Sequence, residues 1–184
     1  MRMSRGPSSQ GSRTPARAQA VPAKEVTTLL PVHWPGVAET FRQGLASGLA
    51  SFETEVPGWE DWDSAHLAGH RFVAVRGGEV VGWAAVTPVL NRCSGSGVVE
   101  DSVYVAEKAR GQGIGLLLLS RLVASTEEAG IWTVQAQVLA GNEPSPALHK
   151  RAGFRVVGTR ERFNKLDGAW HDVVLLERRS EVLV

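Results

Sequence analysis

The chain has 184 residues, of which 43% are hydrophobic and 21% charged, with a formal net charge of +1 and one cysteine. This length suits one well-buried domain, and the near-neutral charge argues against a general nucleic-acid binder. A single cysteine excludes an internal disulfide and a cysteine-based zinc site, which favours a reducing, cytoplasmic setting. No apolar run is long enough to cross a bilayer, so no membrane partner is expected.

The first 23 residues differ in composition from the rest of the chain. They are rich in Arg, Ser, Pro and Gly and contain no acidic and no aromatic residue. Such a segment buries too little apolar surface to offset its ordering entropy, so we expect a disordered tail over 1–23 and one domain over 24–180. A transit peptide, a cloning remnant and a misassigned start codon are the alternative interpretations of this tail, which lacks the apolar core of a secretory signal.

The first half of the domain is predicted to hold two helices and three strands. An amphipathic helix is expected over 35–50, because apolar residues recur there at steps of four: Val37, Phe41, Leu45 and Leu49. A second, shorter helix is expected over 60–70. Residues 70–86 then predict a β-hairpin around two glycines, and a loop over 87–97 leads to a strand over 98–105.

The second half continues with a helix over 113–129, which Gly130 ends, and a strand over 131–139. Ser145 and Pro146 predict an N-cap and a first helical position for a short helix that reaches Arg151. A last hairpin turns at Asp167-Gly168. This order of elements indicates a mixed α/β domain with antiparallel edges rather than a doubly wound sheet.

A glycine-rich turn over 110–115 lies between the strand and the following helix. Glycines let a backbone approach a ligand, and a helix N-terminus adds partial positive charge there. A P-loop needs Lys and Ser or Thr after its last glycine, but two leucines follow Gly115. A dinucleotide fingerprint needs a third glycine where Leu116 or Leu118 stands. A different phosphate-bearing ligand and a plain tight connection remain as the two interpretations.

The segment Arg-Gly-x-Gly-Ile-Gly after a Val-Tyr-Val strand resembles the acetyl-CoA pyrophosphate loop of the GNAT superfamily of N-acetyltransferases. The resemblance implies an α/β fold of the GNAT acyl-CoA N-acyltransferase type, with a mixed, mostly antiparallel sheet and flanking helices, and acetyl-CoA as the cofactor. It also implies a set of cofactor-binding residues: Val103, Tyr104, Val105, Arg110, Gly111, Gln112, Gly113, Ile114, Gly115, Asn142 and Ser145.

Residues 50–177 resemble more narrowly the phosphinothricin-type branch of this superfamily, which includes methionine sulfone and sulfoximine acetyltransferases. The segments that carry this resemblance are dispersed but in the right order, among them Ser51-Phe52-Glu53-Thr54, Val99-Glu100, Leu148-His149 and Gly168-Ala169-Trp170-His171-Asp172. The branch implies acetylation of a small amino-acid-like amine, in a setting of detoxification or resistance.

Acetyl transfer to an amine needs a group that removes a proton from the ammonium form. Glu100 and Asp101 lie on the cofactor strand, and strand alternation places them on opposite faces without saying which one faces the thioester. The branch resemblance selects Glu100. It also implies a catalytic role for His149, as an acid toward CoA or as a partner of Glu100 in proton transfer. A histidine that only fills a gap in the core is the alternative.

The resemblance also implies an acceptor site with walls from Phe52, Glu53 and Thr54, and with Arg92 as the group that binds an acid on the acceptor. Gly95 and Leu166 depart from the branch pattern in this region, so the acceptor itself stays open. A polyamine, an aminoglycoside and a protein N-terminus are alternative acceptors, and a non-catalytic CoA-binding regulatory domain is an alternative function. No metal is expected. A homodimer is compatible with the resemblance, but no residue here indicates one.

Overall fold

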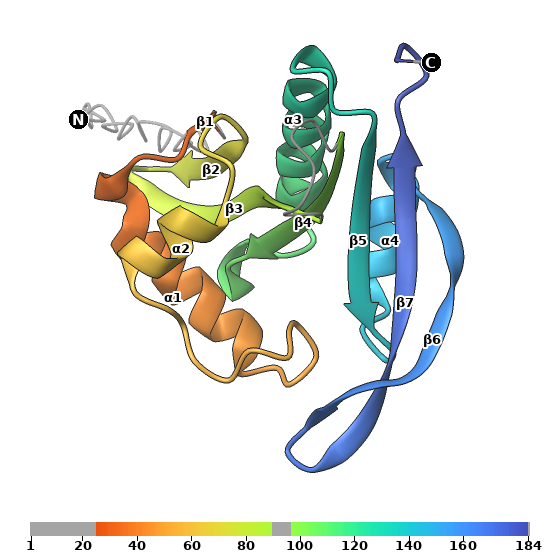
Figure 1. Cartoon of the computed structure of the whole chain (residues 1–184). Helices are drawn as coiled ribbons and strands as arrows, with labels where there is room; N and C mark the ends of the chain where they lie inside the picture. Colours follow the sequence, from red (N-terminus) through yellow and green to blue (C-terminus); the bar gives the residue numbers. More distant parts are fainter. Residues whose placement is uncertain (1–24, 90–96, 184) are drawn as a thin grey trace, which may run out of the picture.

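The computed structural model describes residues 25–89 and 97–183. Within these residues seven strands form one sheet, in the order β1-β2-β3-β4-β5-β7-β6 (Figure 1). Neighbouring strands are antiparallel except for the parallel pair β4 and β5. The strand bounds are Glu25–Thr28 for β1, Arg71–Arg76 for β2, Glu79–Pro88 for β3, Val98–Val105 for β4, Thr133–Leu139 for β5, Arg155–Leu166 for β6 and Ala169–Arg179 for β7. The predicted mixed, mostly antiparallel sheet is confirmed.

Helices cover both faces of the sheet. Their bounds are Trp34–Leu45 for α1, Trp59–Ala65 for α2, Ile114–Glu128 for α3 and Pro144–Arg151 for α4, with short 3-10 turns at Pro31–His33 (η1) and Glu107–Ala109 (η2). α1 and α2 pack on one face, and α3 and α4 pack on the other (Figure 1). None of the helices in the described part of the chain has both the length and the apolar character that crossing a membrane requires.

Each face of the sheet has its own hydrophobic core. On the α1 face, Phe41 and Trp62 pack against Trp83 of β3. On the α3 face, Leu118 and Leu122 are fully buried among apolar side chains of β2 to β5. The leucines that follow the glycine-rich turn therefore fix α3, and with it the turn at its N-terminus, to the sheet.

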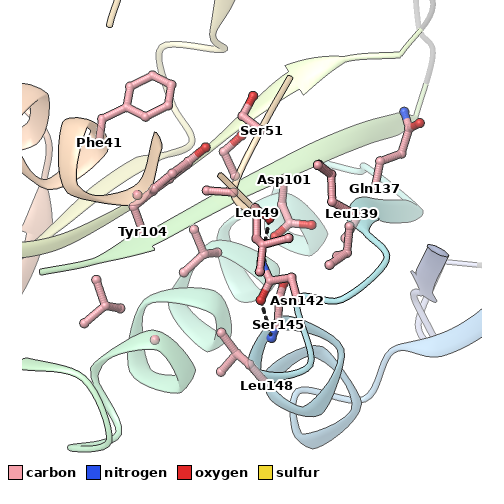
Figure 2. A pocket seen from close by; sticks show the side chains of 18 of the residues that line it. Phe41, Leu49, Ser51, Asp101, Tyr104, Gln137, Leu139, Asn142, Ser145 and Leu148 are labelled. Carbon is pink, nitrogen blue, oxygen red and sulfur yellow. Dashed lines mark hydrogen bonds between the residues drawn. The ribbon is translucent and has the colours of Figure 1, made fainter. Parts of the chain in front are cut away.

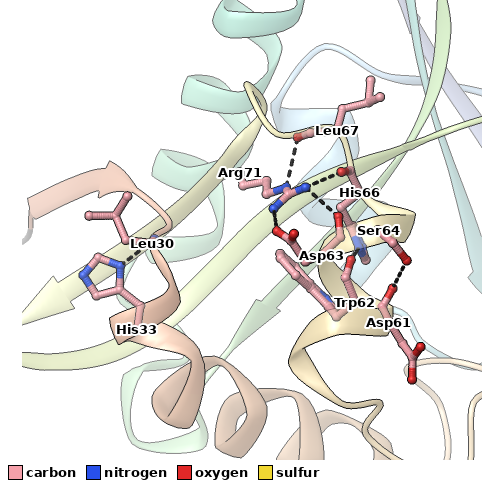
Figure 3. A network of polar contacts seen from close by, with 9 residues as sticks. All are labelled: Leu30, His33, Asp61, Trp62, Asp63, Ser64, His66, Leu67 and Arg71. Carbon is pink, nitrogen blue, oxygen red and sulfur yellow. Dashed lines mark hydrogen bonds and ion pairs between the residues drawn. The ribbon is translucent and has the colours of Figure 1, made fainter.

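The first two helices are shorter than the sequence predicts. α1 ends at Leu45, and residues 46–50 form turns instead of a last helical turn. α2 ends at Ala65, where the side chain of the buried Arg71 binds the C-terminal end of the helix. The Arg71 guanidinium contacts the Asp63 carboxylate and donates to carbonyl oxygens at the end of α2 (Figure 3). These contacts satisfy carbonyls that a helix end leaves without intrahelical partners.

α4 also starts earlier than predicted. Pro144 occupies its first turn and Glu143 is the N-cap, so the prediction of Ser145 as the N-cap is wrong. The Asn142 side chain, one residue earlier, instead accepts a hydrogen bond from the Ser145 backbone N–H at 3.4 Å. The end of α4 follows the prediction, with Gly153 at a φ of 89°.

β4 and β5 separate part-way along their length. Their parallel register runs only from Val98–Thr133 to Glu100–Gln135. Beyond that point β4 stays paired with β3 as far as Val105, and β5 stays paired with β7 (Figure 1). The sheet is thus split from Glu100 onward, and the glycine-rich turn lies beyond the end of the split strand.

Candidate functional site

A cleft of about 1220 Å³ opens where β4 and β5 separate. Its walls come from the loop after α1, from α2, β4 and β5, from the turn before α3 and from α4 (Figure 2). The structure brings most of the predicted site residues to this one cleft: Phe52, Glu53, Glu100, Val103, Tyr104, Val105, Arg110, Gly111, Gly113, Ile114, Gly115, Asn142, Ser145 and His149.

Three predicted residues are not part of the cleft lining that the structure describes. Thr54 is exposed outside it. The Gln112 side chain turns away from the cleft, accepting from the Arg76 guanidinium at 2.5 Å and donating to the Lys108 carbonyl at 3.0 Å. Arg92 lies outside the described residues, so its predicted role has no structural test.

The glycine-rich turn is open on the side that faces the cleft. Gly111 and Gly113 have φ values of 71° and 79°, and a Cβ added at either one would meet no atom within 4 Å. Gly113 is the N-cap of α3, whose first turn contains no acidic residue. Positive φ, free space and an uncompensated helix N-terminus together suit the close approach of an anionic group.

Glu100 is half-buried at the point where the two strands part. Its Oε2 accepts two hydrogen bonds, from Gln135 Nε2 at 2.7 Å and from Gln137 Nε2 at 2.6 Å. Both glutamines belong to β5 and alternate onto the same face of that strand. One carboxylate oxygen is therefore fixed by two amides, and Oε1 has no partner among the described residues.

Asp101 and His149 form a buried pair on the opposite face of β4. His149 Nε2 lies 3.0 Å from Asp101 Oδ2, and the two side chains are only 5% and 1% exposed. His149 Nδ1 lies 2.7 Å from the Ser145 carbonyl oxygen, which can only accept. Burial lowers the pKa of His149, but the charge of Asp101 and the hydrogen bonds with Asp101 and Ser145 outweigh it, and the pKa is raised overall. We assign a protonated imidazole with a proton on each nitrogen.

The turn before α4 is tied to the loop after α1 across the cleft. Asn142 Nδ2 donates to the Leu49 carbonyl at 3.0 Å, while its Oδ1 accepts from the Ser145 N–H (Figure 2). Asn142 and Ser145 thus line the cleft, and in this structure their polar groups bond within the chain. Their contacts with the cofactor stay a prediction.

The end of the cleft beside α1 and α2 is aromatic. The Tyr104 ring stacks on Trp83 with centroids 4.7 Å apart, and its hydroxyl points toward Ser51 (Figure 2). Phe52 approaches Phe163 of β6, with ring centroids 6.0 Å apart. Burial raises the pKa of Tyr104, with a contribution from the charge of Glu53. Burial also raises the pKa of Glu53, against a hydrogen bond with Ser51.

The comparisons with known proteins agree with this architecture. The sequence model of the acetyltransferase (GNAT) family matches residues 37–154. The chain belongs to the GNAT family. Members of this family use acetyl-CoA, and this chain is an acetyl-CoA-dependent N-acetyltransferase with the GNAT fold.

Several relatives of this GNAT chain carry more specific names. It is 34% identical over 155 residues to phosphinothricin N-acetyltransferase of Alcaligenes faecalis, covering 78% of this chain and 76% of that protein. It is 33% identical over 100 residues to L-methionine sulfoximine/L-methionine sulfone acetyltransferase of Pseudomonas paraeruginosa, covering 54% and 58%. Phosphinothricin acetyltransferase of Sinorhizobium meliloti, solved in complex with acetyl-CoA, superposes with a TM-score of 0.76 at 26% identity, covering 85% and 88%. The predicted resemblance to the phosphinothricin-type branch is confirmed.

The residues of the cleft fit acetyl-CoA. The open glycine-rich turn can hold a pyrophosphate, because the first turn of α3 contains no carboxylate. The exposed Arg110, whose guanidinium lies 4.0 Å from the Glu107 carboxylate, can add positive charge there. Residues 103–105 of β4, which no longer pair with β5, can hold an extended amide-containing arm beside the strand. No group of three or more His, Cys, Asp or Glu side chains in the described part of this GNAT domain is arranged to hold a metal ion.

Sequence reasoning did not identify the polar partners of the two acids in this GNAT domain. From the sequence, Gln135 and Gln137 are only part of a predicted strand, and Asp101 is only an alternative to Glu100 as the base. Two glutamines that alternate with buried apolar residues on one strand are a usable signal, because both must project from the same face. The pairing of Asp101 with His149, 48 residues apart, had no such local signal.

Proposed function

We propose that this acetyltransferase acetylates the α-amino group of a small amino-acid-like acceptor, with Glu100 as the general base. The observation that carries the proposal is the geometry of Glu100. Two amides hold its Oε2 where β4 and β5 part, and Oε1 has no partner among the described residues. A carboxylate fixed in this way is already oriented to accept a proton from the acceptor amine.

In the proposed reaction the bound thioester provides the acetyl group, and residues of this chain move the proton and stabilise the developing charge. When bound, acetyl-CoA supplies an acetyl group activated as a thioester. Glu100 would remove one proton from the acceptor ammonium, which gives the nitrogen a lone pair for the new C–N bond. The C–S bond would break with CoA leaving as the thiolate, and the second proton lost by the nitrogen would balance the proton that the thiolate takes up. The backbone N–H groups of Val103 and Val105, which alternate away from β3, would donate to the carbonyl oxygen as negative charge builds on it.

His149 is proposed to act by position and charge. Its two nitrogens face Asp101 and the Ser145 carbonyl, so a proton passed to CoA would cost one of these buried contacts. The pair joins α4 to β4 beside the split in the sheet. It therefore holds the turn with Asn142 and Ser145 at the edge of the cleft. An acid role for His149, as implied by the resemblance, stays a prediction.

The relatives support the class of acceptor. Their names specify phosphinothricin, methionine sulfoximine and methionine sulfone, all of which are small amino-acid-like compounds. The aromatic end of the cleft, with Phe52, Tyr104 and Phe163, offers apolar surface for a short side chain. The hydroxyl of Ser51 and the carboxyl of Glu53 add hydrogen-bonding groups there.

A screen of amines tests the proposal. Release of free CoA is measured after mixing the protein and acetyl-CoA with methionine sulfone, methionine sulfoximine, phosphinothricin, kanamycin or spermidine. We expect release with one or more of the first three and none with the last two. A screen in which only the cationic amines react would replace the amino-acid acceptor with a polyamine or aminoglycoside. No release with any amine, together with normal acetyl-CoA binding, would favour a non-catalytic CoA-binding domain.

A further inference from the structure

A guanidinium lies beside the cleft: Arg160 is not one of the lining residues but contacts two of them. Arg160 belongs to the exposed edge strand β6 and has two side-chain contacts. Its Nη1 lies 3.5 Å from Oε1 of Gln137, and its Cζ lies 5.3 Å from the centroid of the Phe163 ring. Gln137 and Phe163 both line the cleft. Arg160 is therefore held at the mouth of the site by two of its lining residues.

No carboxylate neutralises Arg160 within residues 25–89 and 97–183. Two other arginines of the same hairpin are paired, Arg155 with Glu177 and Arg178 with Glu127, whereas Arg162 and Arg179 lie, like Arg160, more than 4.0 Å from any carboxylate of the described residues. The 3.5 Å contact with a neutral amide oxygen is at the long end of the hydrogen-bond range. A guanidinium in this state keeps donors for a bidentate contact with a carboxylate.

Gln137 contacts both Arg160 and the proposed base Glu100. The Nε2 of its side-chain amide donates to Glu100 at 2.6 Å, while the Oε1 of the same amide faces the guanidinium. Glu100 and Arg160 thus stand at the two ends of one amide group. The distance between base and guanidinium follows from the dimensions of that amide and its two contacts.

The amine and carboxylate of an α-amino acid are separated by nearly the same distance as the nitrogen and oxygen of the Gln137 side-chain amide. The nitrogen and oxygen of an amide are two bonds apart, and the amine and carboxylate oxygen of an α-amino acid are three bonds apart, which adds about 1 Å. Each end then needs one hydrogen bond of about 3 Å. An acceptor lying alongside Gln137 therefore reaches Glu100 with its amine and Arg160 with its carboxylate at the same time.

We propose that Arg160 binds the α-carboxylate of the acceptor and determines the specificity of the enzyme for α-amino acids over simple amines. This inference rests on the proposed function. Gln137 is the positioning residue that sets the separation of Arg160 from Glu100. The site selects a substrate in which an amine and a carboxylate are carried by the same carbon.

Steady-state kinetics with a matched pair of acceptors test the inference. The pair is methionine sulfone and the primary amine that remains when its carboxylate is replaced by hydrogen. Arg160→Gln is expected to raise the KM for methionine sulfone about ten- to a hundredfold, because a charge-assisted contact is lost. The KM for acetyl-CoA and the kcat/KM for the matched amine are expected to stay as in the wild type. Arg160→Lys restores part of the lost affinity, since the charge returns without the bidentate geometry.

Arg155→Gln is the control, because it removes one arginine from the far end of the same strand. It is expected to leave both acceptors unaffected. An Arg160→Gln variant with an unchanged KM for methionine sulfone, or with equal losses for both acceptors, overturns the inference alone. A wild type that releases no CoA with any amino acid overturns the proposed function and the inference together.

Discussion

Glu100 and Asp101 are adjacent in the chain but project from opposite faces of β4 to different partners. The Glu100 carboxylate accepts from Gln135 and Gln137 of β5, whereas the Asp101 carboxylate pairs with His149 of α4. The register of β4 with β3 runs without a shift, so no bulge exchanges the two side chains. One strand thus carries a half-buried carboxylate at the acceptor side and a fully buried ion pair at the α4 side.

The two hydrogen bonds that orient the Glu100 carboxylate predict that a substitution of Gln135 lowers the rate of acetylation. Gln135→Leu removes one of the two amides that fix Oε2 but does not alter the cleft lining. A hydrogen bond to a charged group is worth about 1.5–3 kcal/mol, so we expect kcat to fall about ten- to a hundredfold. Steady-state assays of CoA release measure kcat for the wild type and the variant. An unchanged kcat would show that Gln137 alone is enough to orient the base.

The buried pair predicts a pH dependence of stability. Despite burial, Asp101 raises the pKa of His149 above its ordinary value of 6.5, so the folded protein binds this proton more tightly than the unfolded chain does. The stabilisation is complete below pH 6.5 and is lost as the pH rises through the folded-state pKa. We expect the difference in free energy of unfolding between wild type and His149→Gln to shrink from acidic to alkaline pH.

Chemical denaturation of both proteins over a pH series provides this difference. His66 and His70, whose pKa values are lowered by burial, change the stability in the opposite direction. They are present in both proteins, so their contributions cancel. A difference that grows toward alkaline pH would contradict the assignment of a protonated His149 beside Asp101.

The glycine-rich turn predicts a loss of cofactor affinity in Gly113→Ala. The new methyl would meet no protein atom, but it would occupy the space through which an anionic group approaches the N-terminus of α3. A non-glycine residue at this φ costs about 1–2 kcal/mol of stability. Gly78→Ala is the matched control, with a φ of 82° and equally open space in the β2–β3 turn. We expect similar losses in Tm for both variants and weaker acetyl-CoA binding by calorimetry only for Gly113→Ala.

The close packing of Gly44 in α1 against Tyr104 predicts that substitutions at these two positions have coupled effects on stability. A Cβ at Gly44 would lie 2.5 Å from two ring carbons of Tyr104, which is confined between Phe41 and Trp83. Gly44→Ala is therefore expected to destabilise the protein by about 1–3 kcal/mol. In a Tyr104→Ala background the clash is gone, and the same change is expected to stabilise α1 by up to about 1 kcal/mol. A double-mutant cycle without this change of sign would contradict the close packing.

Local patterns predicted most of the fold. The steps of four in α1, the glycine turns of the two hairpins and the leucines of α3 each specify an element through nearby residues. β1 was not predicted, because it is a four-residue edge strand that pairs only with β2. The end of α2 was predicted too late, since the contacts of Arg71 that terminate it depend on tertiary structure.

The site could be predicted only in part for the same reason. The glycine-rich turn and the acids of β4 are contiguous in sequence, so their type and spacing indicate the chemistry. Gln135 and Gln137 meet Glu100 only because β4 and β5 are parallel neighbours for three residue pairs. Asp101 meets His149 only once α4 packs against β4. Such pairings depend on strand order, which the composition of a single segment does not determine.

Glu100→Gln tests most directly whether Glu100 serves as the base for amine acetylation. The variant keeps the size of the side chain but removes the carboxylate that accepts the proton. With methionine sulfone as the acceptor, we expect kcat to fall about 10²–10⁴-fold while the Kd for acetyl-CoA, measured by calorimetry, stays that of the wild type. A Glu100→Gln enzyme that releases CoA at close to the wild-type rate would contradict the role of Glu100 as the base.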